Sequence, residues 1–159
     1  MADVIQESYS GPETAEIIGV SYARLDSWSR RGSFFVPSIR QAKGTGTSRA
    51  YSFTDLCELS AIVRMRQRGL SLQQLRKVKE TLMMLDLRTP WTFLIARGDD
   101  VLVAQGPEQL ISILSAPGQF AFTVLSMPEV VSDVQMKACE IVNRRNKKEE
   151  PIQEVPFVL

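Results

Sequence analysis

The sequence predicts an α+β protein in which a mainly helical N-terminal half with one basic hairpin precedes a small α/β C-terminal domain. Two short helical stretches joined by a three-residue turn begin the chain, and strand-like and helical stretches alternate in its second half. Charge is also divided. Residues 21–79 hold 12 Lys or Arg and 3 Asp or Glu, a net +9, whereas residues 81–159 hold 7 and 10, a net −3. The first half is therefore expected to face a polyanion.

The first two helices are predicted from their capping residues. Ser10 can cap a helix that begins at Pro12, because proline suits the first helical position. After the turn Gly19–Ser21, Ser21 can cap a second helix from Tyr22 to about Arg31, which Gly32 would end. The expected buried side of the first helix consists of Ala15, Ile17 and Ile18. Two short helices in this order, the second rich in arginine, outline a helix-turn-helix.

A hairpin and two further helices are predicted next. Phe34–Arg40 and Arg49–Phe53 suit short strands, and the stretch between them is small, polar and basic, which is typical of a wing. Thr54 is expected to cap a third helix that runs to about Arg68. Gly69 would end it, and Ser71 would start a fourth helix along the apolar positions Leu72, Leu75, Val78, Leu82 and Leu85.

The second half has shorter elements. Trp91–Ala96 and Val101–Ala104 predict a β-hairpin, Pro107–Leu114 a helix, Phe120–Leu125 a strand and Glu129 to about Arg145 a helix. The last helix has an apolar stripe that would either seal a dimer or cover the sheet: Val130, Val134, Ala138, Ile141 and Val142. We therefore expect a winged helix-turn-helix domain over residues 8–86, a small α/β dimerisation or regulatory domain over 90–145, and a flexible tail over 146–159.

Several functional classes are disfavoured by composition. Histidine is absent, which removes the commonest general base and metal ligand. Cys57 and Cys139 are single thiols without metal-ligand spacing, and Gly44-Thr45-Gly46 lacks the lysine of a phosphate loop. We therefore expect no enzyme, no metal and no cofactor. With no long apolar run and no secretory leader, we expect a cytoplasmic, nucleoid-associated protein without membrane contact.

The N-terminal half resembles a known family in several motifs that occur in order. They are Gly19–Trp28, Arg30-Arg31-Gly32, Arg49–Ser52, Asp55-Leu56 and Arg68–Arg76, and together they are similar to the MerR regulators. The Leu-Asp-x-Trp helix, the Gly-Thr-Gly-Thr-Ser wing and Tyr-Ser-Phe-x-Asp look closest to the actinobacterial FtsR-type subgroup. A weaker similarity to the C-terminal domain of that subgroup extends through residues 93–125.

This resemblance implies a MerR-type winged helix-turn-helix that binds a pseudo-palindromic operator as a homodimer and distorts the duplex. Asp26-Ser27-Trp28 stands where many members have Arg-Tyr-Tyr, so phosphate contacts by these positions are not implied. The cysteines of metal-sensing members are absent as well. RNA polymerase or another protein is a further possible partner.

Two residues in the first turn of the second helix are expected to reach base edges in the major groove, Tyr22 and Arg24. Arg30 and Arg31 are expected to contact phosphates, although one of them can instead pair with Asp26. Arg40 and Lys43 would meet phosphates or the minor groove from the wing. Arg49 and Tyr51 match the Arg-x-Tyr of the family and are expected at phosphates, with Tyr51 alternatively a core residue.

The remaining candidates each have a structural alternative. Trp28 is expected to wedge the second helix against the third rather than to stack on a base. Arg64, Arg66 and Arg68 are spaced by two and cannot share one helix face. The aromatic residues Trp91, Phe93, Phe120 and Phe122 would line an effector pocket or form ordinary core.

Two other functions are compatible with the sequence. One is a DNA-bending accessory or architectural factor, although such proteins are usually little more than the DNA-binding domain. The other is an antitoxin or adaptor whose C-terminal domain binds another protein.

Overall fold

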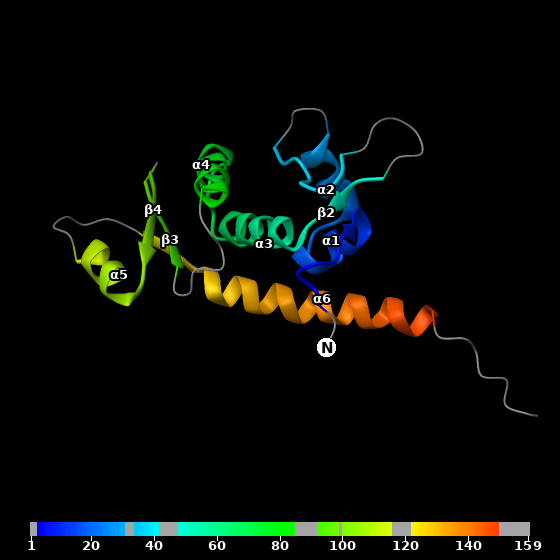
Figure 1. Ribbon diagram of the computed structural model, residues 1–159. Helices are drawn as coiled ribbons and strands as arrows, with labels where there is room; N and C mark the ends of the chain where they lie inside the picture. Colours follow the sequence, from blue (N-terminus) through cyan, green and yellow to red (C-terminus); the bar gives the residue numbers. More distant parts are fainter. Residues whose placement is uncertain are drawn as a thin grey trace, which may run out of the picture.

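The computed structural model describes residues 3–30, 34–41, 48–84, 92–98, 100–115 and 122–149 (Figure 1). Its N-terminal part contains β1 (Tyr9–Ser10), α1 (Gly11–Ile18), α2 (Tyr22–Ser29), β2 (Ala50–Tyr51), α3 (Phe53–Gln67) and α4 (Leu72–Met83). Its C-terminal part contains β3 (Thr92–Arg97), β4 (Asp100–Gln105), α5 (Pro107–Leu114), β5 (Phe122–Ser126) and α6 (Met127–Glu149). The predicted α+β fold class is confirmed. None of these helices combines the length and the apolar content that a membrane crossing requires.

The predicted caps of three helices are confirmed. Ser10, Ser21 and Ser71 are the N-caps of α1, α2 and α4, and each side chain accepts a bond from the third residue of its helix. The cap predicted for α3 is wrong, because Ser52 rather than Thr54 caps it. Ser52 and Asp55 form a capping box, in which each side chain accepts from the backbone of the other. Thr54 has no such partner three residues on, and the reciprocal pair fixes the helix start.

The helix α2 ends earlier than its predicted end near Arg31. Its last residue is Ser29, and Arg30 is extended with φ −73° and ψ 137°. The backbone N–H of Phe35 donates to the carbonyl oxygen of Trp28 at 2.9 Å, which turns the chain back against the end of the helix. Gly32, the predicted stop, lies outside the described residues.

The predicted wing hairpin is present only at its base in the described residues. Arg40 and Ala50 form an isolated antiparallel bridge, with backbone bonds of 3.1 and 2.9 Å. Instead of forming a longer hairpin, β2 pairs antiparallel with β1, so that Tyr9 lies opposite Tyr51. This pairing was not predicted, because a two-residue strand has no sequence periodicity. The tip, including Gly44–Gly46, lies outside the described residues.

The C-terminal sheet has the order β4-β3-β5 and is antiparallel throughout. The predicted hairpin, helix and third strand are all present, with β5 beginning at Phe122. Phe93 and Phe122 are half-buried, and Trp91 and Phe120 lie outside the described residues, so an effector pocket there stays a prediction. The helix α5 packs on β4 and has no fully buried residue.

The long helix α6 runs beneath α3 and α1 (Figure 1), and its stripe packs against these helices as well as β3. All five predicted stripe residues are buried. The sequence suggested a dimer contact or the sheet as the surface that this stripe covers. In the structure, the stripe mainly covers the N-terminal part of the same chain. Arginines secure the contact, with Arg144 paired to Glu16 at 2.9 Å and Arg145 to Glu13 at 2.7 Å. The helix continues to Glu149, into the stretch predicted to be a flexible tail.

Candidate nucleic-acid interface

One side of α2 is buried in the core, and the opposite side is exposed to solvent. Leu25 is fully buried and Ser29 is 1% exposed, so one side of this short helix is fixed in the core. Tyr22 is 51% exposed, and Arg24 is also exposed. The first turn of α2 therefore offers an aromatic phenol and a guanidinium to a ligand, as the sequence predicts.

The ring of Tyr22 packs against the first residue of α1, Gly11. The Tyr22 ring lies so close to Gly11 that a Cβ there would be 2.6 Å from the ring atom Cε2. Real Cβ atoms do not approach other atoms this closely, so glycine at position 11 is what permits the present position of the ring. The first residue of α1 thus helps to orient a side chain of α2.

Arg24 lies on the flank of α2 that faces α4. Its guanidinium carbon is 6.0 Å from the ring centre of Trp28, within cation–π range. Trp28 meets Phe34 edge to face at 6.1 Å, and both rings line a small cavity with Ile62 and Leu75. Trp28 is half-buried against the core, in agreement with its predicted role as a wedge.

Asp26 is the centre of an ion-pair network that ties α2 to the strand region. It accepts from Nε of Arg30 at 2.8 Å and also from Arg49. Both bonds hold the pKa of Asp26 below its usual value, and the bond from Arg49 has the larger effect. Arg49 also donates to Gln41 at 2.7 Å, and Gln41 donates to the carbonyl oxygen of Ser29 at 2.6 Å. The alternative pairing of Arg30 with Asp26 is therefore present.

Tyr51 is a core residue, the alternative that the sequence left open, and not an exposed phosphate ligand. It is 1% exposed, and its hydroxyl hydrogen-bonds to Oγ of Ser29 at 2.8 Å. Burial raises its pKa, which keeps the hydroxyl protonated. Arg49 is half-buried with its bonds directed inward, so both residues brace the end of α2 from behind.

The basic wing residues are only partly described. Arg40 is exposed at the wing base, and its guanidinium donates to the carbonyl oxygen of Ser48 at 2.7 Å and to Oγ of Ser48 at 3.2 Å. Arg31 and Lys43 lie outside the described residues. Within the described residues, Tyr22 and Arg24 thus lie in the first turn of α2, Arg30 directly follows the helix, and Arg40 lies at the wing base.

Comparison with known families matches residues 9–82 to the MerR HTH family regulatory proteins. This range covers β1 to α4 almost completely. The N-terminal domain belongs to the MerR family. The motifs that carried the resemblance, from the turn before α2 to the first turn of α4, all lie inside the matched range.

Three related proteins, one from Mycobacterium bovis and two from strains of Mycobacterium tuberculosis, are each named as an uncharacterized HTH-type transcriptional regulator. Each is 44% identical over 68 residues, which is 43% of this chain and 30% of the relative. The chain thus spans less than a third of the length of these relatives. The matched stretch is less than half of this chain, so these relatives say nothing about the chain as a whole.

The three arginines at the end of α3 in the MerR-type domain have separate roles. Arg64 pairs with Asp133 of α6 at 2.5 Å, and Arg68 donates to the carbonyl oxygen of Val124 in β5. Arg66 is exposed and lines the same cavity as Arg24. Two of the three therefore join the C-terminal part to the MerR-type domain, and only Arg66 lies beside the outer face of α2.

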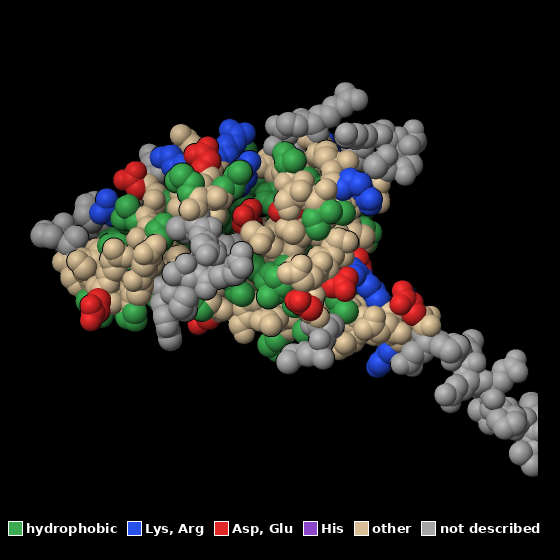
Figure 2. Space-filling view, viewed as in Figure 1, with side chains coloured by type: hydrophobic (Ala, Val, Ile, Leu, Met, Phe, Trp, Pro, Cys, Tyr) green, Lys and Arg blue, Asp and Glu red, His purple; other side chains and the backbone are tan. Residues whose placement is uncertain are grey.

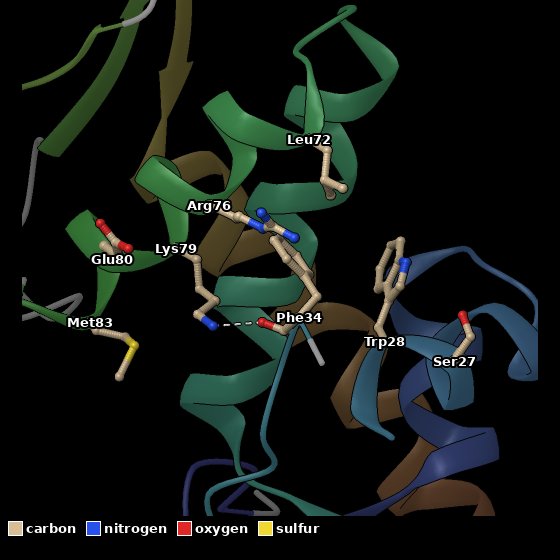
Figure 3. A pocket seen from close by; sticks show the side chains of 8 residues that line it. All are labelled: Ser27, Trp28, Phe34, Leu72, Arg76, Lys79, Glu80 and Met83. Carbon is tan, nitrogen blue, oxygen red and sulfur yellow. Dashed lines mark hydrogen bonds between the residues drawn. The ribbon is translucent and has the colours of Figure 1, made fainter. Parts of the chain in front are cut away.

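The fourth helix of the MerR-type domain adds a basic surface that sequence analysis did not select. Lys and Arg side chains gather among hydrophobic ones over α4 (Figure 2), and this helix carries Arg76, Lys77 and Lys79. A groove of about 680 Å³ lies between α4 and α2. Arg76 and Lys79 line it from α4, where Lys79 is hydrogen-bonded to Phe34, and Trp28 lines it from α2 (Figure 3). The spacing of Leu72, Arg76 and Lys79 on one helix face was the available signal.

Proposed function

We propose that this protein is a sequence-specific DNA-binding transcription regulator of the MerR type, which binds a pseudo-palindromic operator as a homodimer. The observation that carries the proposal is the first turn of α2, where Tyr22 and Arg24 are exposed on a helix whose opposite side is buried. A short helix held in this way can enter the major groove with its N-terminal residues against the base edges. Membership of the N-terminal domain in the MerR family supports the same assignment.

Arg24 and Tyr22 are assigned to the bases. A guanidinium fork can bond O6 and N7 of guanine together, and within the described residues Arg24 pairs with no carboxylate. Arg30 and Arg40 are assigned to phosphates, because both are exposed and border α2 or the wing. Phosphate contacts fix the position of the helix and add affinity without sequence preference. Arg31 and Lys43 are assigned the same role from the sequence.

Arg49 and Tyr51 are assigned to positioning. Their bonds to Asp26 and Ser29 fix the last turn of α2 relative to the strand pair. Loss of either would tilt the helix that Arg24 uses to reach a base. They act through α2 and would not touch the duplex.

The small size of the contact that one α2 can make supports dimerisation. The eight residues of α2 span about 12 Å, which is a small part of one helical turn of DNA. Two copies on a two-fold axis would double the contacts and explain a pseudo-palindromic site. Expected partners are thus operator DNA and a second copy, with RNA polymerase or another protein as a further candidate. We expect a non-enzymatic protein in the cytoplasm.

The experiment is genome-wide binding by the tagged full-length protein, followed by gel shift of the strongest site at several salt concentrations. Recovery of one inverted repeat near promoters is the expected result. Diffuse binding without a shared motif would overturn sequence-specific regulation and favour a DNA-bending role. Recovery of a stoichiometric protein with no DNA enrichment would favour the adaptor function.

The salt series also tests the wing. If Lys43 contacts one phosphate, Lys43→Ala should reduce the slope of log affinity against log salt concentration by about one unit. Lys137 of α6 carries the same charge and serves as the control, with an unchanged slope expected for Lys137→Ala. An unchanged slope for Lys43→Ala would remove this residue from the DNA contact.

A further inference from the structure

A second cavity, of about 300 Å³, lies between α3, α4 and the segment 35–38 that leads into the wing. Phe35, Val36 and Met83 supply apolar walls, while Asp55, Glu58 and Lys79 supply charged groups. Lys79 and Met83 also line the groove in Figure 3, so the two hollows adjoin. The proposed DNA contacts use none of these six side chains.

Glu58 is the unusual member of this set. It is 9% exposed, and within the described part of the chain its carboxyl group has no hydrogen bond or ion pair. Burial raises its pKa to about 7, with a further increase from Asp55 and a smaller opposing effect from Lys79. Its oxygens are not among the fully enclosed, unbonded side-chain atoms of the described residues, so the carboxyl opens toward the cavity, where a cation can reach it.

Neither of the two neighbouring charged side chains, Asp55 and Lys79, pairs with Glu58; each is bonded to other groups. Asp55 is 4% exposed, and its Oδ2 accepts from the backbone N–H and Oγ of Ser38, both at 2.8 Å, and from the N–H of Ser52 at 2.9 Å. The Nζ of Lys79 donates to the carbonyl oxygen of Phe34 at 2.6 Å and lies 5.5 Å from the centre of that ring. Lys79 is thereby directed toward Phe34 and the larger groove, and Glu58 keeps its acceptor capacity.

We propose that this cavity binds a small organic ammonium ion, namely a primary amine that carries one compact apolar group. The ammonium would donate to the carboxylate of Glu58, and the apolar group would lie against Phe35, Val36 and Met83. The volume is at the lower end of ligand sites, which limits the ligand to a small molecule. An anion is disfavoured because two carboxylates and one already engaged ammonium line the cavity.

Binding of this cation should release a proton near neutral pH. The ligand pairs with the ionised form of Glu58, so it must displace the proton that burial favours. The charged groups that face the cavity are Asp55 and Glu58 from α3 and Lys79 from α4, and the segment 35–38 contributes no ionisable side chain. With a pKa of about 7, the ionised fraction of Glu58 rises about tenfold between pH 6 and pH 8.

Isothermal titration calorimetry of the full chain with 2-phenylethylamine tests the site, with the neutral isostere 2-phenylethanol as the matched ligand. The amine should bind at least tenfold more tightly than the alcohol at pH 8. Its affinity should fall about tenfold from pH 8 to pH 6, because Glu58 becomes protonated while the amine keeps its charge. Glu58→Gln should abolish both the preference for the amine and the pH dependence.

Two controls keep the result interpretable. Glu58→Gln removes a buried ionisable group, so its Tm should equal or exceed that of the parent. Val36→Trp places a large ring at an exposed position of the cavity wall and should abolish amine binding by filling the space. No binding by the parent, equal affinity for amine and alcohol, or unchanged amine binding in either variant would overturn the proposal. These readouts contain no DNA, so they stand or fall separately from operator binding.

Discussion

Arginines on the outer face of α2 and at the contact of α6 with α1 have opposite environments. At the α6 contact, Arg144 and Arg145 pair with Glu16 and Glu13 at 2.9 and 2.7 Å. On α2, Arg24 contacts the ring of Trp28 and, within the described ranges, has no carboxylate beside it. Paired guanidinium groups hold two parts of the chain together, whereas an exposed one keeps its donors for a base or phosphate.

Arg30 and Arg49 form an intermediate case, because both pair with Asp26. Arg49 is half-buried and its bonds point inward, but the side chain of Arg30 is 72% exposed. An exposed ion pair is weak and can be exchanged for a phosphate contact at little cost. The presence of a carboxylate therefore does not by itself separate structural from functional arginines, and burial of the pair decides between them.

The largest expected effect is at the apolar part of the α6 contact. Ile141 is 4% exposed, so Ile141→Ala should lower the free energy of unfolding by roughly 2–5 kcal/mol through lost burial and the cavity left behind. Met136 lies on the same helix but is 65% exposed, and Met136→Ala should change stability by at most about 0.5 kcal/mol. Urea unfolding at pH 7 measures both, and similar losses would contradict the packing of α6 described above.

A smaller effect, on DNA affinity alone, is expected for Arg24. Arg24→Ala should weaken operator binding by roughly 1–3 kcal/mol more than binding to random DNA, because one base contact is lost. Arg97→Ala removes the same charge from the C-terminal sheet, where Arg97 pairs with Asp100, and should leave the ratio unchanged. Gel shifts with both duplexes measure this ratio. An equal loss on operator and random DNA would make Arg24 a phosphate contact.

The third effect concerns the polar part of the α6 contact and depends on pH. Burial opposes ionisation of Glu13, but hydrogen bonds from Arg145 and Ser10 overcome it and lower the pKa of Glu13 from 4.5 to about 2. The resulting stability is fully present above about pH 5 and is lost as the pH falls toward 2. Arg145→Ala should therefore cost about 1–2 kcal/mol at pH 7, and the difference from the parent should shrink below pH 4.

The neighbouring Arg144 is the control for this prediction. Arg144 and Glu16 are both more than half exposed, so Arg144→Ala should leave the free energy of unfolding nearly unchanged at any pH. Chemical unfolding between pH 2 and pH 7 measures both variants. A constant difference for Arg145→Ala across this range would show that the ion pair with Glu13 is not its source.

Local signals made most of the fold predictable. Ser10, Ser21 and Ser71 cap helices because a hydroxyl before an apolar periodic stretch satisfies backbone N–H groups within three residues. The cap of α3 could also have been predicted from the sequence, since Ser52 has Asp55 at the capping-box position. The pairing of β1 with β2 could not, because it joins residues about 40 positions apart and each strand has two residues.

The site was less predictable than the fold, because exposure depends on tertiary packing. Tyr22 and Tyr51 are both tyrosines in family motifs, but one is 51% and the other 1% exposed. Periodicity identified the buried stripe of α6 and could not say which surface it covers. Glu58 was overlooked because a carboxylate in an amphipathic helix ordinarily lies on the solvated side. Its burial follows from the segment 35–38, which lies across the start of α3.

The smallest expected effect tests whether α1 orients the face of α2 that we propose contacts DNA. Gly11→Ala places a Cβ 2.6 Å from Cε2 of Tyr22, so the ring must rotate away. Because Tyr22 is 51% exposed, the rotation should leave the unfolding free energy nearly unchanged while operator affinity falls about two- to fivefold. In a Tyr22→Ala background the same substitution should have no effect on affinity, since the displaced ring is gone. A loss of equal size in both backgrounds would mean that Gly11 acts through the backbone of α1. Packing of the Tyr22 ring against α1 would then play no part in DNA recognition.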